Sequence, residues 1–287
     1  MMLNGVFIDE KTFVEVIERF RVAQIEAGKS DLTAKTYAHT LQSFADWLTT
    51  SNGDINNPTR FDVQSYITHL DEQGKSAVTI DKTYAAISVF ADWLERGDIV
   101  RDIRKAEVRK QRNIAPKSLD RNERNRLLRD VERDGNTRNI AIVYMLLQTG
   151  LRVSELCALD KTDIVMSERK GQVNVRHGKG DVARSVPLPR EARLYLQRYL
   201  ETRTDINPAL FLSRQGRITP RMVQYILGKY GIHPHMLRHT YCRDLVSNGV
   251  DIAVVAELAG HSDINVTRRY SKPTQDELHK VIDRVFS

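Results

Sequence analysis

Residues 233–241, with the sequence HPHMLRHTY, combine three histidines and one arginine on a single predicted helix. Because Pro234 suits the first turn of a helix, we expect His235 and Arg238 to lie one turn apart on the same face, at the helix N-terminus. A helix N-terminus offers partial positive charge and free amide donors, and the forked guanidinium of arginine matches phosphate oxygens. This segment therefore predicts an anion site.

The same histidines could instead indicate a zinc site. Arg238 would repel a metal cation, and no carboxylate or thiolate lies nearby on the same short element. The two cysteines, Cys157 and Cys242, are far apart and offer neither a disulfide framework nor a metal-ligand motif. We therefore expect no metal and no cofactor, and we expect His239 to face away from the anion site.

Two further segments, one with an arginine and one with a lysine, contain residues that could act on a bound phosphate. In TGLRVSEL, residues 149–156, Arg152 follows a glycine turn, and Glu155 comes three residues later. Arg152 could be a second phosphate clamp that Glu155 orients, or the two could form an ordinary surface ion pair. In GKG, residues 178–180, Lys179 is either a catalytic donor at the tip of a turn or a solvated lysine.

The segment AGHSDINVTRRYSK, residues 259–272, contributes His261 and, nine residues later, Tyr270. A lone histidine is usually structural, and a lone tyrosine is usually a core or surface residue. Only the combination of these two with the arginines and the lysine gives them a chemical meaning.

Helices are the main elements that would position these residues. Apolar stripes at helical spacing predict four helices between residues 9 and 96, joined by short turns, which indicates a small bundle. One of these stripes contains Phe61, Tyr66, Ile67 and Leu70. We assign residues 1–100 to this first helical domain.

A second helical domain is expected from residue 118 to residue 287. It is interrupted at residues 172–188, where apolar and polar residues alternate on both sides of a glycine-flanked turn, which predicts a β-hairpin with Lys179 at its tip. Helices are expected to resume near Arg190. A short helix from Asp251 to Ala259 should end at Gly260, and a last amphipathic helix should span 275–286.

The stretch between the two domains, residues 101–117, reads as an extended linker. Its first twelve residues hold six basic and two acidic side chains and show no apolar periodicity. Such a run is usually solvated, but between two domains of a basic protein it could follow a phosphate backbone. The candidate DNA contacts in it are Arg101, Arg104, Lys105, Arg109, Lys110 and Arg112.

Charge and hydropathy narrow the class of protein. Residues 1–100 hold 9 lysines and arginines against 15 acidic residues, and the remainder holds 35 against 22. A basic second half suggests a polyanionic partner, most often nucleic acid. The apolar run Ile140–Leu147 is far too short to span a bilayer, and the N-terminus shows no secretory signal. We expect a cytoplasmic protein that does not bind membranes.

Taken in chain order, Arg152, Lys179, His235, Arg238, His261 and Tyr270 resemble the catalytic set of the tyrosine recombinases, the group of phage integrases and Xer recombinases. HMLRHTY is similar to that family's H-x-L-R-H motif, LAGHSD to its L-x-G-H motif, and TGLRVSEL to its first-arginine motif. The resemblance is strong over residues 118–287 and consists only of a helical bundle of suitable size over residues 9–96.

The resemblance implies a mainly α fold, with an N-terminal four-helix SAM-like core-DNA-binding bundle. A mostly helical catalytic domain with a small β-hairpin or sheet would follow it. The implied reaction is transesterification at a DNA phosphate, in which Tyr270 forms a 3′-phosphotyrosyl bond and releases a 5′-hydroxyl. His235 would accept the phenol proton and Lys179 would protonate the leaving oxygen. Arg152, Arg238 and His261 would stabilise the phosphoryl oxygens, so neither metal nor ATP would be required.

The resemblance also implies the partners. They are double-stranded DNA with a specific core site and further copies of the chain, two per site and four in the synaptic complex; accessory proteins are an open question. In the C-terminal helix, Leu278, Ile282 and Phe286 would contact a neighbouring subunit. Lys75 and Lys82 would grip DNA from the otherwise acidic bundle. The cell would be bacterial or archaeal, with the protein on the nucleoid.

Three alternatives remain at this point. One is a monomeric type IB topoisomerase with the same chemistry, another is a DNA-binding module without catalysis, and the third is the metal hydrolase suggested by the histidines. Because no arm-binding domain precedes the bundle, we expect a simple recombinase of the Xer or transposon- or plasmid-resolvase kind. The target sequence, the directionality and the choice among integration, dimer resolution and cointegrate resolution cannot be read from these residues.

Overall fold

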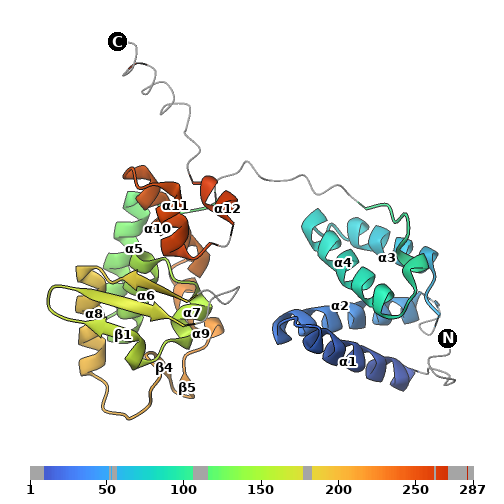
Figure 1. Ribbon diagram of the computed structural model, residues 1–287, viewed down its shortest axis with the longest axis horizontal. Helices are drawn as coiled ribbons and strands as arrows, with labels where there is room; N and C mark the ends of the chain where they lie inside the picture. The colour runs from blue at the N-terminus through green and yellow to red at the C-terminus, as the bar shows by residue number, and fades with distance from the viewer. Residues whose placement is uncertain are drawn as a thin grey trace. The chain divides into compact units, whose positions relative to one another are not determined.

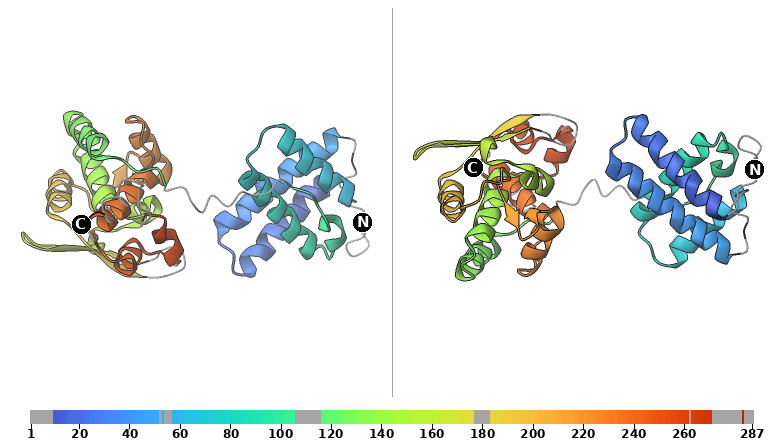
Figure 2. Two further views of the ribbon diagram at one scale, coloured as in Figure 1. Left: turned by 90° about the horizontal axis from the view of Figure 1, so that it is seen from above. Right: turned by 90° about the horizontal axis from the view of Figure 1, so that it is seen from below.

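The computed structural model describes residues 10–51, 53, 57–105, 116–176, 183–261, 263–270 and 283. The contacts divide the chain into two compact units, residues 1–111 and 112–287, which we describe one at a time (Figures 1 and 2). In the described part of the chain, no helix is both long and apolar enough to cross a membrane.

The N-terminal unit is a bundle of helices, as predicted. Its elements are α1 (Glu10–Glu26), α2 (Asp31–Thr50), α3 (Arg60–Glu72), α4 (Ala77–Trp93) and the 3₁₀ helix η1 (Gly97–Val100). The side chains of Ser30, Thr59 and Ser76 accept hydrogen bonds from the third residue of α2, α3 and α4, and so cap these helices. Local sequence therefore fixes where three of the helices begin.

Aromatic side chains fill the core of the bundle. The ring of Phe20 has no exposed surface and meets the rings of Phe90 and Trp93 edge-on, at centroid distances of 5.2 and 5.6 Å. The assignment of Phe61 to an apolar stripe is wrong, because this side chain is 76% exposed. It lies in the first turn of α3, whose buried face begins at Val63 instead.

The residues that follow η1 differ from the expected extended linker. Arg60 donates hydrogen bonds to the carbonyls of Arg101 and Asp102, at 2.6 and 2.7 Å. Lys105 forms an ion pair with Asp81 and lies over the ring of Tyr84, 4.4 Å from its centroid. Residues 101–105 therefore pack on the bundle, and the charge of Lys105 is already paired. The other candidates of this stretch, Arg109, Lys110 and Arg112, lie outside the described residues.

A largely buried helix, α6, lies at the centre of the second unit. All residues of Ile140–Leu147 are buried, so the apolar run forms part of the protein core. The helix contacts its neighbours in the unit on several sides (Figure 1). The helices of this unit are α5 (Arg121–Arg133), α6 (Thr137–Thr149), α7 (Val153–Ala158), η2 (Lys161–Asp163), α8 (Arg190–Glu201), α9 (Pro220–Gly228), α10 (Pro234–Ser247), α11 (Ile252–Ala259) and α12 (Ile264–Arg268).

The predicted β-hairpin is confirmed as the antiparallel pair β2 (Gly171–Val175) and β3 (Arg184–Pro187), in which Val175 is opposite Arg184. A third strand, β1 (Ile164–Met166), extends it to the order β1-β2-β3, and β4 (Leu212–Ser213) pairs with β5 (Gly216–Arg217). The sequence did not predict these additional short strands. Lys179 and, apart from residue 283, the predicted amphipathic segment at 275–286 lie outside the described residues.

Candidate active site

Arg238 is one of the few buried charged residues in the described chain, and only 5% of it is exposed. As predicted, Pro234 occupies the first position of α10, so Arg238 lies near the helix N-terminus. Its Nη1 donates to the carbonyl of Gly150 at 2.5 Å, and its Nη2 donates to the carbonyl of Ala259 at 2.6 Å. Burial, followed by the nearby Arg152, lowers the pKa of Arg238 to about 10, so the guanidinium remains charged at neutral pH.

Two left-handed glycines create the acceptors for this guanidinium. Gly150 ends α6 with φ 63°, and Gly260 ends α11 with φ 65°. Carbonyls at a helix C-terminus have no partner within the helix and carry partial negative charge, so they favour a cation. A Cβ at Gly150 would lie 2.3 Å from the ring of Tyr241, so this turn also requires a residue that has no side chain.

Arg152 binds the same turn as Arg238. Its Nη2 donates to the carbonyl of Gly260 at 2.7 Å, one residue beyond the carbonyl that holds Arg238. Its Nη1 donates to Oε1 of Glu155 at 2.8 Å. The two arginines are therefore adjacent, and their like charges meet at the end of α11. Because the two positive charges repel each other, we expect that a bound anion would stabilise this arrangement.

Glu155 is 3% exposed, which excludes the surface ion pair that the sequence left open. Besides Arg152, it accepts two hydrogen bonds from Arg184, at 3.0 and 2.9 Å. Burial opposes its ionisation, but the hydrogen bonds from Arg184 and the backbone of Arg152 outweigh burial and lower the pKa of Glu155. Two arginines therefore bind a single carboxylate, and with Arg238 nearby the cluster keeps a positive excess.

Sequence reasoning missed Arg184. On β3 it shares a face with Val186 and, one alternation further, Leu188, both of which are buried. An arginine on the inward face of a strand needs a partner inside, and this signal could have been read from the sequence. Its Nε also donates to the carbonyl of Leu258, 3.2 Å away, so β3 is attached to α11.

His261 follows Gly260 directly and packs against α12. Its Nδ1 lies 2.7 Å from Oγ1 of Thr267, a fully buried side chain. Burial and then the nearby Arg238 lower the pKa of His261 to about 4, so the ring is neutral at pH 7. If Thr267 donates to Nδ1, the hydrogen is on Nε2, which can then donate to a ligand.

Tyr270 is 8% exposed and lies in a small apolar cluster with Cys242, Val255 and Ala259. Its hydroxyl is 2.5 Å from Nδ1 of His239. The expectation that His239 faces away from the site is therefore wrong. Residues four apart share a helix face, so His239 follows His235 on α10, with ring centroids 6.2 Å apart.

Burial changes the acidity of these groups in opposite directions. It raises the pKa of Tyr270 above its ordinary value, and Cys242 adds to this effect. Burial, and then the nearby His235, lowers the pKa of His239 to about 4. Desolvation, followed by His233 and Arg238, lowers the pKa of the more exposed His235. At pH 7 the phenol is therefore protonated, and the imidazole beside it is neutral.

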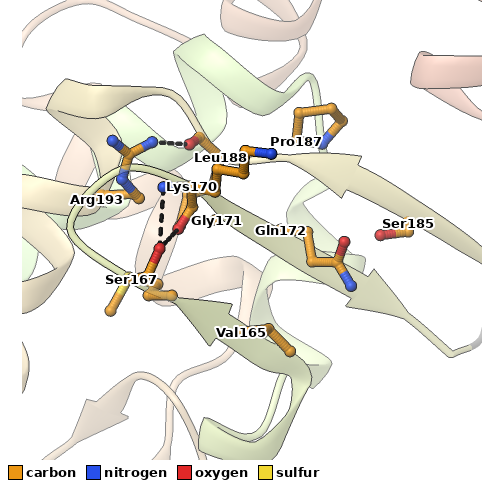
Figure 3. A pocket seen from close by; sticks show the side chains of 10 residues that line it. Val165, Ser167, Lys170, Gly171, Gln172, Ser185, Pro187, Leu188 and Arg193 are labelled. Atoms are coloured by element: carbon orange, nitrogen blue, oxygen red, sulfur yellow. Dashed lines mark hydrogen bonds between the residues drawn. The ribbon is translucent and has the colours of Figure 1, made fainter.

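The described residues include no group of three histidine, cysteine, aspartate or glutamate side chains that could hold a metal ion. A pocket of about 560 Å³ on the three-stranded sheet contains none of the candidate catalytic residues (Figure 3). Some of its polar groups bond to one another, because Arg193 donates to the carbonyl of Leu188 and the Lys170 amide donates to Ser167. The described candidate catalytic residues lie instead around α10 and the end of α11.

Comparison with known proteins identifies the family to which this fold and this site belong. The profile of the Phage integrase family matches residues 117–277, and that of the Phage integrase, N-terminal SAM-like domain matches residues 17–97. Tyrosine recombinase XerA of Pyrococcus furiosus is 31% identical over 286 residues, with 96% of each chain covered. Tyrosine recombinase XerC of Bacillus licheniformis is 33% identical, covering 90% of this chain and 91% of that protein.

Among solved structures, the pre-cleavage complex of the XerH site-specific recombinase with its difH substrate has the same fold. Its TM-score is 0.68 at 20% identity, and the match covers 93% of this chain and 83% of that chain. A helical SAM-like unit followed by a mostly helical unit with a small antiparallel sheet is thus the architecture of a tyrosine recombinase. The chain belongs to the phage integrase family of tyrosine-type site-specific DNA recombinases. The predicted family, fold class and enzyme class are confirmed.

Proposed function

We propose that this enzyme cuts and rejoins double-stranded DNA at a specific core site through a 3′-phosphotyrosyl bond at Tyr270. The observation that carries the proposal is the pair Arg152 and Arg238, held side by side on consecutive carbonyls of the turn at Gly260. A phosphate bound there would be stabilised most when negative charge grows on its oxygens. The nucleophile belongs to the segment that packs against the same turn.

Each residue of the set has a role that its environment supports. Arg152 and Arg238 would bind the two non-bridging oxygens, and neutral His261 would donate a further hydrogen bond to them. His235, exposed on the same face of α10, would line the phosphate site. Fixed cations at these positions do the work that metal ions do in many phosphoryl-transfer enzymes, so the reaction needs neither metal nor ATP.

Lys179 would protonate the departing 5′-oxygen. It lies outside the described residues, but β3 leads from its turn into the site through Arg184, which is bound to Glu155. Five residues of extended chain span at most about 17 Å, so a lysine at this distance from Arg184 is within reach of the arginine pair. This short tether supports the assignment.

For the partners, we propose DNA held by both units and four copies of the chain in the synaptic complex, two per site. The XerH structure is a complex with a DNA substrate, and a lambda integrase fragment is a dimer on a core site. Leu278, Ile282 and Phe286 would contact the neighbouring subunit. The protein would act in the cytoplasm of a bacterial or archaeal cell, on the nucleoid.

The test is a search for covalent protein–DNA adducts. The protein would be mixed in EDTA with a library of fragments from its source replicon, and the products separated on denaturing gels, with Tyr270→Phe in parallel. We expect an adduct with the wild type and none with the variant, and sequencing of the trapped DNA would give the site. An adduct that persists in Tyr270→Phe would show that another residue is the nucleophile. Shifted DNA without any adduct would favour a binding module.

A further inference from the structure

The attack of a protonated tyrosine requires a group that takes its proton. A tyrosine with a pKa of about 10 is roughly 0.1% ionised at pH 7, and burial raises the pKa of Tyr270 further. The sequence suggested His235 for this task. In the structure the phenol has a different neighbour, because Nδ1 of His239 is 2.5 Å from its hydroxyl oxygen.

The surroundings of His239 suit a proton acceptor. The titratable and charged groups near it are His233, His235 and Arg238 from the N-terminal part of α10, Arg269 and Tyr270 beyond α12, and His261 after α11. The lowered pKa of His239, about 4, leaves the imidazole unprotonated at neutral pH. Arg238 and Arg269 also act on the phenol and favour its ionised form. The site thus provides an empty acceptor nitrogen and positive charge for the phenolate.

The other neighbours of the phenol are poorer acceptors. Cys242 also touches the Tyr270 hydroxyl, but burial raises the pKa of its thiol to about 11, so it is protonated at neutral pH and cannot accept the proton. The ring of His235 stacks on that of His239, with centroids 6.2 Å apart, and the described contacts of the Tyr270 hydroxyl are with His239 and Cys242. Among the described side chains in contact with the hydroxyl, His239 alone is unprotonated at neutral pH and can accept a proton.

We propose that His239 is the general base that takes the proton from Tyr270, a catalytic role additional to the six residues assigned above. The hydrogen of the neutral ring is on Nε2, so that Nδ1 can accept. As the Oη–P bond forms and the P–O5′ bond breaks, the phenol proton moves to Nδ1 of His239, and the 5′-oxygen takes its proton from Lys179. In the reverse step His239 returns the proton to the tyrosine. This inference rests on the proposed function.

The experiment measures the rate of adduct formation against pH for the full-length protein on the DNA site found by trapping. For the wild type, we expect a rate that is nearly independent of pH from about pH 6 to pH 9. His239→Gln keeps size and polarity but loses the base, so we expect about 10²- to 10⁴-fold slower cleavage at pH 7. Its rate should then rise about tenfold per pH unit, because only the ionised phenol reacts.

Cys242→Ala is the matched control, because it removes the other contact of the hydroxyl without removing a base. We expect it to slow the reaction by less than about tenfold and to leave the profile flat. A DNA substrate with sulfur in place of the bridging 5′-oxygen needs no leaving-group proton. It should therefore rescue Lys179→Ala but not His239→Gln.

Several outcomes would overturn the proposal. A pH-independent loss in His239→Gln would assign His239 a structural role only, and a gain in rate would make its contact with Tyr270 an inhibitory one. A rising profile in His235→Gln with a flat one in His239→Gln would return the base to His235. Failure of the wild type to form any adduct would overturn the proposed function itself. If the wild type forms the adduct and His239→Gln has the same rate and pH profile, this inference alone is overturned.

Discussion

At the scale of residues, the site depends on buried charges that are paired with backbone carbonyls and a single carboxylate. Each of the motifs around Arg152, Arg238 and His261 is local, and the prediction that they lie together came from their resemblance to the tyrosine recombinase set. The contacts of Arg184 and His239 were missed, since they join segments 29 and 31 residues apart. Sequence periodicity gives the face of an element but not the segment that packs against it.

Replacement of Glu155 by glutamine tests this charge pairing. The variant would leave Arg152 and the buried Arg184 without their carboxylate partner. We expect the free energy of unfolding to fall by about 3 to 5 kcal/mol, as when a buried ion pair loses one partner. Urea denaturation measures the change, with the exposed Glu257→Gln on α11 as a control that should stay within about 0.5 kcal/mol of the wild type. Equal behaviour of the two variants would contradict the account.

Stability should also depend on pH through the two histidines whose pKa is about 4, His239 and His261. Unfolded histidines have a pKa near 6.5, so between these values the unfolded chain binds more protons than the folded one. Their contribution is fully present above about pH 6.5 and is lost as the pH falls toward 4. We expect the urea midpoint to drop over this range, and to drop less in His239→Gln. The same change at exposed His39 should leave the drop intact; equal pH dependence of all three proteins would contradict the assignment.

At the scale of elements, helix ends bring the functional groups together. α6 and α11 both end in a left-handed glycine; Arg238 binds a carbonyl at the end of each helix, and Arg152 binds the carbonyl of Gly260. The sequence predicted α11 with Gly260 at its end, the hairpin and the N-terminal position of Pro234 in α10, whereas α6 was expected only as part of a helical domain. It did not predict β1, because a strand of three residues gives no pattern that can be told from a loop.

Gly260→Ala tests the turn that carries both arginines. A Cβ at residue 260 would lie 2.6 Å from Nη1 of Arg184, at a φ of 65°. Gly249 is the matched control, because it has φ 81° and nothing within 4 Å of the added carbon. Both variants should lose about 1 kcal/mol of stability from backbone strain. Only Gly260→Ala should also slow adduct formation, by about tenfold or more, since it displaces Arg184 from Glu155; equal rates for the two would refute this.

At the scale of the whole molecule, the acidic and basic halves coincide with the two units, and the comparisons cover both. Binding of DNA by the acidic bundle must then come from local patches. Lys75 and Lys82 are exposed there, whereas Lys105 is paired with Asp81. The sequence predicted the bundle and the candidate lysines, but it could not show that Lys105 has a partner 24 residues away.

The double variant Lys75→Ala/Lys82→Ala tests whether the bundle grips DNA. Each phosphate contact contributes about 0.9 to the slope of log affinity against log salt concentration. We therefore expect the slope measured on the trapped site to fall by about 2, whereas Lys105→Ala should change it by less than about 1. A slope that is unchanged in the double variant would mean that these lysines do not contact phosphates.

The most direct test of the central claim is the identity of the bond between protein and DNA. The trapped adduct would be digested with protease and nuclease, and the nucleotide-bearing peptide sequenced by mass spectrometry. We expect a nucleotide attached through its 3′-phosphate to Tyr270, with a free 5′-hydroxyl on the other DNA end. A nucleotide on any other residue, or one joined through a 5′-phosphate, would contradict it.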